Sequence, residues 1–527
     1  MRALLLELEV GGQARRYTTA PEPQTIGADT YVPGLDLASV AVFELTQTTA
    51  IITDPAVDWP AILLGSGGPP VWPARIYWTS GDGVAYPLQV GLASVDAAGL
   101  PAWVLSISID SAMAAGVKLI PDPASAVQPD SYPVSASGPT ATIWAQHEPT
   151  VGAIPPLVYG IPGNAAKGLY SGQGIPGPAT PAYLVELGQG ALDQGYGTLE
   201  IANGPIAATR VKVFDVSAGY TRTKWMEAPV NVAYMLDATG RPRTVAKIDG
   251  TIVAVDLLAT AGSEYWCSFY SDSGGGVADP LTGLTMRDAS LIVPDLLRRC
   301  GYPVDTGRGG SLAGYTLDFS ITEPADALDW ITQHLGGLPL NVYRSGAGFY
   351  ADIEPLDSAA AGLAVRLGSQ ASIGDTLSWA APASVASEVV IDYAPIRGQP
   401  ARSERLTATA QPGARASVLC ALAAARGLSF VAQVALPAVY DVATAGRAAD
   451  LVALDRCSAG PYGQIETGDL ELLQSLLLQG PLAILTIDET DSAEAMGLQG
   501  RRCYVRSMTC SPAGLSMAVR FLREAAI

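Results

Sequence analysis

The sequence has very little histidine: His147 and His334 are its only two in 527 residues. Neither has a histidine partner four residues away, so a zinc site on an H-E-x-x-H helix is excluded. A Ser/His/Asp or Cys/His catalytic arrangement would need one of these two residues, and no nucleophile-elbow or cysteine-centred motif accompanies either. We interpret both as surface or structural histidines and predict no catalytic residue.

Cysteine is also scarce and lacks any metal-binding spacing. The six cysteines contain no C-x-x-C pair, and their even number is weak support for disulfides in a chain of this length. A free cysteine on an apolar helical face behaves as a small hydrophobic residue. We predict that most of them are buried thiols, and we expect no metal and no cofactor. The cysteines concerned are Cys267, Cys300, Cys420, Cys457, Cys503 and Cys510.

Positive charge is low: 31 Lys and Arg stand against 50 Asp and Glu, a net charge of −19. Phosphate neutralisation needs clustered Lys and Arg, so specific nucleic-acid binding is not expected. The negative balance either keeps a large apolar protein soluble or repels DNA that passes close by. Arg298, Arg299 and Arg308 are local basic spots that could bind a neighbouring subunit.

Long apolar runs and phosphate-binding loops are absent as well. No stretch approaches the roughly 18 apolar residues of a membrane span. The leucines at positions 4–6 are followed by Glu7 and Glu9, which is not the pattern of a signal peptide, so we expect a soluble protein without its own export signal. The glycine-rich stretches 65–68 and 307–310 lack the Lys-Ser/Thr of a Walker motif.

What is abundant is glycine and proline, with 56 and 39 residues, alongside 49% apolar residues. Short apolar runs separated by turns predict a mainly β protein of roughly three or four domains at about 150 residues each. Residues 1–150 are expected to form a β-barrel or sandwich, in which 103–109 shows the alternation of a half-buried strand. Residues 151–180 are a Pro/Gly-rich connection, and 181–285 a second or inserted β-rich domain. The sequence shows no internal repeat.

Residues 286–355 predict a helix, a strand, a helix and a hairpin. Asp288 opens the first helical pattern, and Pro294 inside it suggests that the regular helix starts only there. A strand is expected at 315–319. Ser320 or Thr322 is the expected cap of the second helix, since Glu323 completes a capping box with Ser320. The runs 338–343 and 349–354 predict the hairpin.

Several phrases in this region resemble the hub domains of phage tail tips and baseplates, which the spikes of contractile injection systems share. They are the Gly-Tyr-Pro-Val-Asp at 301–305, the Tyr-x-Leu-Asp-Phe at 315–319, the helix at 323–330, the Leu-Val-Tyr-Gly stretch within 155–163 and the Leu-Gln-Gly-Arg at 498–501. The resemblance implies an α+β hub-like domain at 286–395, and helices with a closing β-barrel at 396–527.

By resemblance, such hubs are structural, non-enzymatic virion proteins made in the host cytoplasm. They form homotrimeric rings that join the sixfold tail tube to a central fibre or spike and line the DNA exit channel. Expected partners are the distal tail protein, the tail tube, and the tape measure or central fibre proteins. Some hubs carry an iron–sulfur cluster on four cysteines, but only Cys503 and Cys510 are close in this sequence, so that cofactor is not expected.

Other interpretations remain open from the residues alone. One is a distal tail ring protein with extra domains, and a surface adhesin is disfavoured by the missing signal peptide. A carbohydrate-active β-protein would use a carboxylate pair in an aromatic-lined cleft near Trp225, Trp266 or Trp330, although Trp330 lies on the hub-like helix and is expected in the core. The candidate carboxylates are Asp326 with Asp329, and Asp488 with Glu489 and Asp491, a group that could also bind calcium but lacks the EF-hand pattern.

Overall fold

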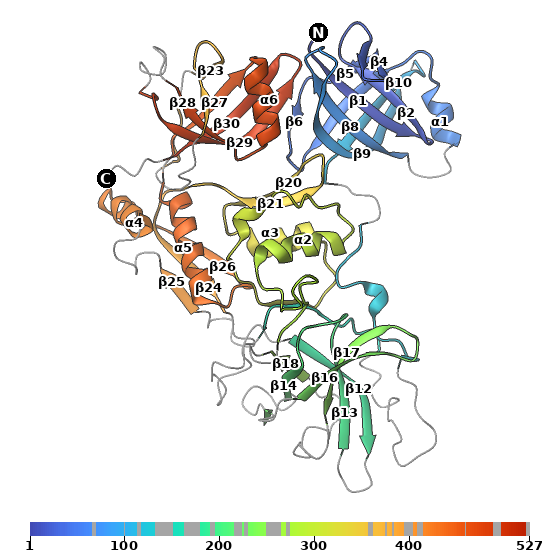
Figure 1. Cartoon of the computed structure of the whole chain (residues 1–527), viewed down its shortest axis with the longest axis vertical. Coiled ribbons are helices and arrows are strands. Elements are labelled where there is room, and N and C mark those ends of the chain that lie inside the picture. The colour runs from blue at the N-terminus through green and yellow to red at the C-terminus, as the bar shows by residue number, and fades with distance from the viewer. Residues whose placement is uncertain are drawn as a thin grey trace.

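The computed structural model describes most of the chain and is mainly β, as the composition predicts (Figure 1). Within the described residues no helix has the length and apolar character to cross a membrane. Those residues are 1–65, 70–99, 101–112, 117–131, 151–162, 180–189, 195–215, 224–225, 230–248, 265–269, 274–356, 362–374, 377–381, 384–394, 404–407, 415–458, 460–488 and 497–522.

The N-terminal residues form one sheet of nine strands, in the order β3-β4-β2-β1-β8-β9-β10-β7-β5. The alternation predicted at 103–109 is confirmed, since Leu105, Ile107 and Ile109 are buried in the core beneath the sheet. The elements are β1 (Ala3–Val10), β2 (Gln13–Thr18), β3 (Gln24–Ile26), β4 (Asp29–Pro33), β5 (Leu35–Asp36), β7 (Gln47–Thr53), α1 (Trp59–Gly65), β8 (Val71–Thr79), β9 (Ala85–Gly99) and β10 (Val104–Asp110).

The C-terminal residues form a second sheet, in the order β22-β28-β29-β30-β27-β23. The short strand β6 (Val40–Ala41), from the N-terminal part of the chain, pairs with β29 of this sheet. The elements are β22 (Leu363–Val365), β23 (Ala371–Ile373), β27 (Tyr462–Thr467), α6 (Leu470–Gln479), β28 (Ile484–Ile487), β29 (Arg502–Ser511) and β30 (Gly514–Phe521). Strands β22 and β23 lie N-terminal to residue 395, so this sheet extends across the predicted boundary.

The two sheets repeat one topology. In the first, β5, β7, α1, β8, β9 and β10 follow in chain order, and the strands lie side by side as β8-β9-β10-β7-β5. In the second, β23, β27, α6, β28, β29 and β30 have the same relative order, with the elements of 386–456 inserted between β23 and β27, and lie as β28-β29-β30-β27-β23. Every neighbouring pair in both series is antiparallel. We call these series the N-unit and the C-unit; their common topology is invisible in the sequence.

A layer of helices and short strands lies between the two units and the rest of the molecule. The predicted hairpin is confirmed as β20 (Leu340–Arg344) with β21 (Phe349–Ile353). Strand β19 (Phe319–Ile321) follows a single bridge at Thr316, instead of the continuous strand expected at 315–319. The helical elements are α2 (Ala289–Arg299), η8 (Gly310–Leu312) and α3 (Ala327–Leu335).

The opening of the first helix at Asp288 is confirmed, whereas the later start at Pro294 and the cap of the second helix were wrong. Helix α2 begins at Ala289, because the Asp288 carboxylate accepts the Ser290 N–H at 2.9 Å, and Pro294 lies inside the helix. Helix α3 is capped by Asp326, which accepts the Leu328 N–H at 2.7 Å, instead of by Ser320 or Thr322. Residues 319–321 form strand β19 in the structure. Sheet pairing at these residues prevents the helix start that the capping-box pattern predicts.

A three-stranded sheet, β25-β24-β26, continues this layer, with two alanine-rich helices in contact with β24. Its elements include a strand over the apolar run at 388–394 and helices over the alanine-rich stretches 416–426 and 443–454. The sheet joins strands from both sides of the predicted boundary at residue 395. The elements are β24 (Ala386–Tyr393), β25 (Glu404–Thr407), α4 (Arg415–Ala425), β26 (Phe430–Leu436) and α5 (Val442–Arg456).

The middle of the chain forms a seven-stranded sheet, in the order β15-β14-β16-β17-β13-β12-β18. The Asp-Ala-Thr-Gly turn at 237–240 connects β16 to β17, and the apolar run at 252–258 lies outside the described residues. The elements are η1 (Pro123–Ser125), β12 (Thr180–Gln189), β13 (Gly195–Ala202), β14 (Arg210–Asp215), β15 (Lys224–Trp225), β16 (Val230–Leu236), β17 (Pro242–Ile248) and β18 (Tyr265–Ser268).

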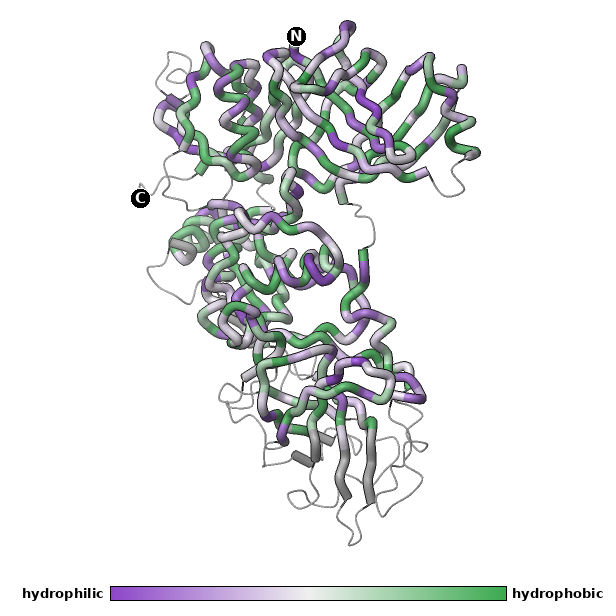
Figure 2. The backbone as a smooth tube through the Cα atoms, turned by 45° about the vertical axis from the view of Figure 1, so that its right-hand side comes forward, coloured by the Kyte–Doolittle hydropathy of each residue, from purple (hydrophilic) through white to green (hydrophobic). Residues whose placement is uncertain are grey.

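The chain runs the length of the molecule and returns. The N-unit and C-unit lie side by side at one end, the helical layer lies beneath them, and the middle sheet forms the opposite end (Figure 1). Hydrophobic and hydrophilic residues alternate along many strands, which gives each sheet a buried and an exposed side (Figure 2). The two units share one apolar core, and the helical layer has another.

Candidate functional site: the junction of the two units

The two units meet along helix α6, which lies between them (Figure 1). Its leucines at 472, 473, 476 and 477 are buried in the core that both units share, and the helix contacts β9 of the N-unit. The N–H of Val42, next to β6, donates to the Met508 carbonyl at 2.8 Å. The two units are therefore joined by a helix, a strand pairing and a common core.

Arg308 contacts the helical layer and both units at once. Its guanidinium donates to the carbonyl oxygens of Leu478 and Gln479, each at 3.0 Å, at the end of α6. It also lies 5.4 Å from the ring centroid of Tyr350 and 5.5 Å from that of Phe43. The sequence singled out Arg308 as a basic spot for a neighbouring subunit; in the structure it binds within its own chain.

A buried charge cluster joins the helical layer to the C-unit. The Glu354 carboxylate, directly after β21, accepts the Tyr504 hydroxyl at 2.6 Å and lies 3.3 Å from the Arg506 guanidinium. Arg520 lies 3.7 Å from Glu354 and 2.5 Å from Asp455 at the end of α5. Burial raises the pKa of the Tyr504 hydroxyl, which therefore stays protonated as a donor. Paired in this way, the charges fix the C-unit to the layer beneath it.

Two of the phrases that carry the hub resemblance lie against each other. Strand β11 (Leu157–Tyr159), from the Pro/Gly-rich stretch, pairs with β19. The Asp318 carboxylate accepts the Ile161 N–H at 2.8 Å and forms a two-point ion pair with Arg287 at 2.7 and 2.8 Å. The described part of this stretch, 155–162, is thus part of the helical layer, and Asp318 holds it there.

His334 belongs to a stack of aromatic rings in this layer. Tyr159 stacks on Phe319 at 5.3 Å, Phe319 on Trp330 at 4.2 Å, and Trp330 on His334 at 4.5 Å between ring centroids. Burial lowers the pKa of the His334 imidazole, and its Nδ1 lies 3.0 Å from the Trp330 carbonyl oxygen. The ring packs against the core, in keeping with its interpretation as structural. His147 lies outside the described residues.

The carboxylate candidates have structural contacts. Asp326 caps α3 and also accepts the Tyr302 hydroxyl at 2.8 Å, and Asp329 lies in the first turn of the same helix. Asp488 forms an exposed ion pair with Arg366 at 3.0 Å. The other two members of that acidic group, Glu489 and Asp491, lie outside the described residues.

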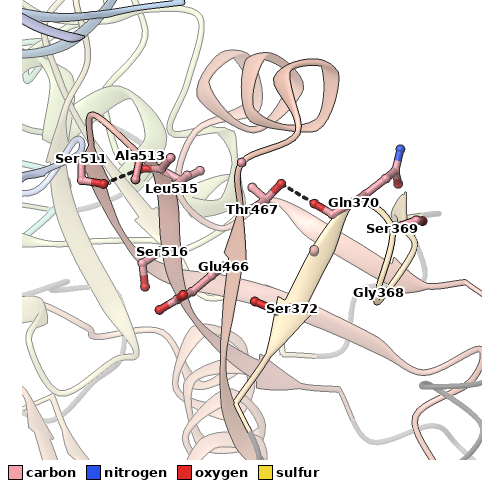
Figure 3. Close-up of a pocket in the computed structure, with 13 residues that line it drawn as sticks. Gly368, Ser369, Gln370, Ser372, Glu466, Thr467, Ser511, Ala513, Leu515 and Ser516 are labelled. Atoms are coloured by element: carbon pink, nitrogen blue, oxygen red, sulfur yellow. Dashed lines mark hydrogen bonds between the residues drawn. The ribbon is translucent and has the colours of Figure 1, made fainter. Parts of the chain in front are cut away.

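Three surface cavities lie near the C-unit, and each contains fewer than the two carboxylates that a glycosidase needs. The groove between β23, β27 and the β29–β30 hairpin has a volume of about 470 Å³ and one carboxylate, Glu466 (Figure 3). Its Thr467 hydroxyl already donates to the Gln370 carbonyl at 2.7 Å. The two others, of about 590 and 810 Å³, contain Glu354 and Asp352 respectively as their single carboxylates. None of the three matches a glycosidase pair.

Two of the three tryptophans named for an aromatic cleft do not line one. Trp266 and Trp330 are both buried in the interior, the latter as expected for the hub-like helix. Trp225 lies on β15, which pairs with β14. The burial of Trp266 excludes it from a surface cleft, and Trp330 is in the core, as expected.

The six cysteines are buried free thiols, as predicted. Cys503 and Cys510 lie on the same strand, β29. Across the part of the chain that the structure describes, no group of three or more His, Cys, Asp or Glu side chains is placed to hold a metal ion.

Comparison with known proteins gives matches among solved structures alone. No protein-family model matches, and no curated protein sequence does. The chain is similar to the 43 kDa tail protein of prophage MuSo2 from Shewanella oneidensis, with 9% identity and a TM-score of 0.26 over 63% of this chain and 89% of that one. It is also similar to a chain of a native gene transfer agent virion, with 11% identity and a TM-score of 0.18 over 52% of this chain and 80% of that one. A third similar structure is a chain of the activated phage P2 baseplate with Ca, with 8% identity and a TM-score of 0.16 over 70% of this chain and 99% of that one. At such low scores these likenesses leave the function to be argued from the chain itself.

Proposed function

We propose that this protein is a structural subunit of a phage tail tip or baseplate, and that three copies form the hub ring between the tail tube and the central fibre or spike. The observation that carries the proposal is the repeated topology of the N-unit and C-unit, side by side at one end of the chain. Three copies with two units each would present six similar units around the axis. Such a ring would match a sixfold tube on one side and a threefold fibre on the other.

The surface of the N-unit supports a head-to-tail ring. Within the chain, α6 of the C-unit packs against the N-unit. Helix α1 has the equivalent place in the N-unit but lies at its outer edge (Figure 1). It has the apolar sequence WPAILLG, and Leu64 on it is 88% exposed. In a closed ring, α1 would pack against the C-unit of the next copy, as α6 packs against the N-unit of its own.

The other roles follow from the same assembly. The ring would belong to the virion, with the distal tail protein, tail tube and tape measure or fibre proteins as partners. The charge of −19 would disfavour adhesion of DNA to the channel wall. No enzymatic step is part of this proposal. A distal tail ring of six copies is disfavoured, because the two units of each copy would then give twelve.

The experiment is mass photometry of the purified chain, with image averaging of the particles. We expect a trimer with a central opening and six similar densities around one rim. A sixfold ring, or a monomer even at high concentration and with the tube partners present, would contradict the proposal.

A charge at α1 tests the head-to-tail contact. Leu64→Glu is expected to weaken trimer formation at least tenfold, because it places a carboxylate in the apolar contact. Leu281→Glu is the matched control, since Leu281 is 93% exposed in a turn of the 274–286 segment, apart from both units. Equal loss of trimer in both variants would show that the effect is not local to α1.

A further inference from the structure

Two buried cysteines of the helical layer lie in direct contact. Cys420 is in the middle of α4, and Cys457 is the residue that caps the C-terminus of α5. Their Sγ atoms are 3.4 Å apart, and the two side chains are 0% and 5% exposed. Of the six cysteines, this is the pair for which the structure gives a sulfur–sulfur contact.

The sequence explains why the two sulfurs can approach so closely. Helix α4 reads RASVLCALAAA and α5 reads VATAGRAADLVALDR, so both are rich in alanine. Small side chains allow helix axes to come close together. Ala449, Ala453 and Leu419 are buried in the same core as the two cysteines. The pair thus sits in a tightly packed contact between two helices.

We propose that Cys420 and Cys457 are a dithiol site that closes to an intramolecular disulfide when the protein meets a small-molecule disulfide such as oxidised glutathione. One protein thiolate attacks a sulfur of the small disulfide and expels one thiolate. The second cysteine then attacks the protein sulfur of the mixed disulfide and expels the other. Two protein thiols and one small disulfide give one protein disulfide and two small thiols, so the reaction is balanced.

The contact geometry favours this pairing over any other. A disulfide requires an S–S distance of about 2.05 Å, so small rotations of the two side chains close the present gap. The hydrogen bond between the two thiols lowers the pKa of Cys420, while that bond and burial raise the pKa of Cys457. Because both are buried, the first step needs a transient separation of α4 from α5 and is slower than for an exposed thiol.

The bond would stiffen the connection to the C-unit. Cys457 lies two residues after Asp455, whose carboxylate holds Arg520 of β30. A disulfide would thus link α4, α5 and the charge cluster into one covalently restrained structure. This consequence rests on the proposed function. The disulfide would let a hub that assembles in a reducing cytoplasm become more rigid after its release into oxidising surroundings.

The test is peptide mapping of the folded wild-type protein after incubation with oxidised glutathione, without any reductant. We expect a peptide that links Cys420 to Cys457, a loss of two of the six titratable thiols, and a thermal midpoint higher by several degrees than in the reduced protein. Retention of all six thiols, glutathione adducts alone, or a mixture of other pairs would overturn the proposal.

Variants separate this pair from buried thiols in general. Cys420→Ala should abolish both the linked peptide and the thermal shift, whereas Cys300→Ala, at a buried thiol of the same core, should leave both unchanged. Since the wild-type mapping needs no variant, poor folding of either one leaves the test intact. The result does not depend on the oligomeric state. The disulfide can therefore fail to form in a protein that is a trimer, and it can form in a protein that is not a trimer.

Discussion

Glu354 and Tyr504 are 150 residues apart in the sequence and 2.6 Å apart in the structure, where the tyrosine hydroxyl donates to the carboxylate. Arg520, almost fully buried, lies on the same carboxylate. The helical layer and the C-unit therefore share one buried cluster. Removing its acid leaves the Tyr504 hydroxyl without its acceptor and leaves Arg520 paired with Asp455 alone.

Glu354→Ala is expected to destabilise the C-unit by about 2 kcal/mol, since the buried Tyr504 hydroxyl loses its acceptor and Arg520 loses one of its two acids. Glu354→Gln should cost less, because the amide oxygen still accepts the Tyr504 hydroxyl. Urea unfolding followed by circular dichroism measures the change. Arg366→Ala, which breaks the exposed ion pair with Asp488, is the control and should cost less than about 1 kcal/mol. Similar losses in the acid and control variants would contradict the role given to burial.

Gly160→Ala tests how the Pro/Gly-rich stretch is held. Gly160 has φ of +67°, and an added Cβ would overlap the Asp318 carboxylate and the Leu317 carbonyl. We expect a loss of about 3 kcal/mol or more and faster hydrogen exchange in β11. Gly240→Ala is matched in backbone conformation, with φ of +80°, but its Cβ would meet nothing within 4 Å. That control should cost about 1 kcal/mol; equal effects would mean that contact with Asp318 is unimportant.

Asp326→Ala separates a helix cap from an active-site acid. The change removes the cap of α3 and the acceptor of the Tyr302 hydroxyl, so we expect a loss of about 1–2 kcal/mol. Asp326→Asn should recover most of it, because asparagine caps almost as well. Asp329→Asn should change stability by less than about 0.5 kcal/mol. A hydrolytic activity on a glycan panel that both asparagine variants abolish would instead support the carboxylate pair.

The middle sheet should lose stability in acid because of Asp237. Burial alone would raise the pKa of this carboxyl, but hydrogen bonds from Thr239, the Arg241 N–H and Arg243 outweigh it and lower the pKa to about 2. An unfolded Asp titrates near about 3.9. Its contribution is therefore complete above about pH 4 and is lost as the pH falls towards 2.

Hydrogen exchange in β16 and β17, measured between pH 5 and pH 2.5 and corrected for intrinsic rates, checks this dependence. Protection of these strands should fall across that range in the wild type. In Asp237→Asn it should be lower at pH 5 but should change less with pH. An unchanged pH dependence in the variant would assign the acid sensitivity to another group.

Local structure was largely predictable where the sequence carries a complete local signal. The β20–β21 hairpin and helices α4 and α5 follow from apolar spacing and turn residues. Helix α6 was missed, although Asp469 caps it by accepting the Leu472 N–H at 2.9 Å and its leucines have helical spacing. The start of α3 was misplaced because a capping pattern at Ser320 competes with the pairing of β19 to β11, which no local pattern reveals.

By itself the sequence determined the mainly β composition, the apolar faces of the individual elements, and the scarcity of groups that could do chemistry. The tertiary structure alone decided which strands lie side by side, and so disclosed the repeat of the N-unit and C-unit. The physical reason is that sheet pairing joins backbone groups at any sequence separation, as when β6 pairs with β29. Side-chain patterns specify which face of a strand is buried, but not its neighbour.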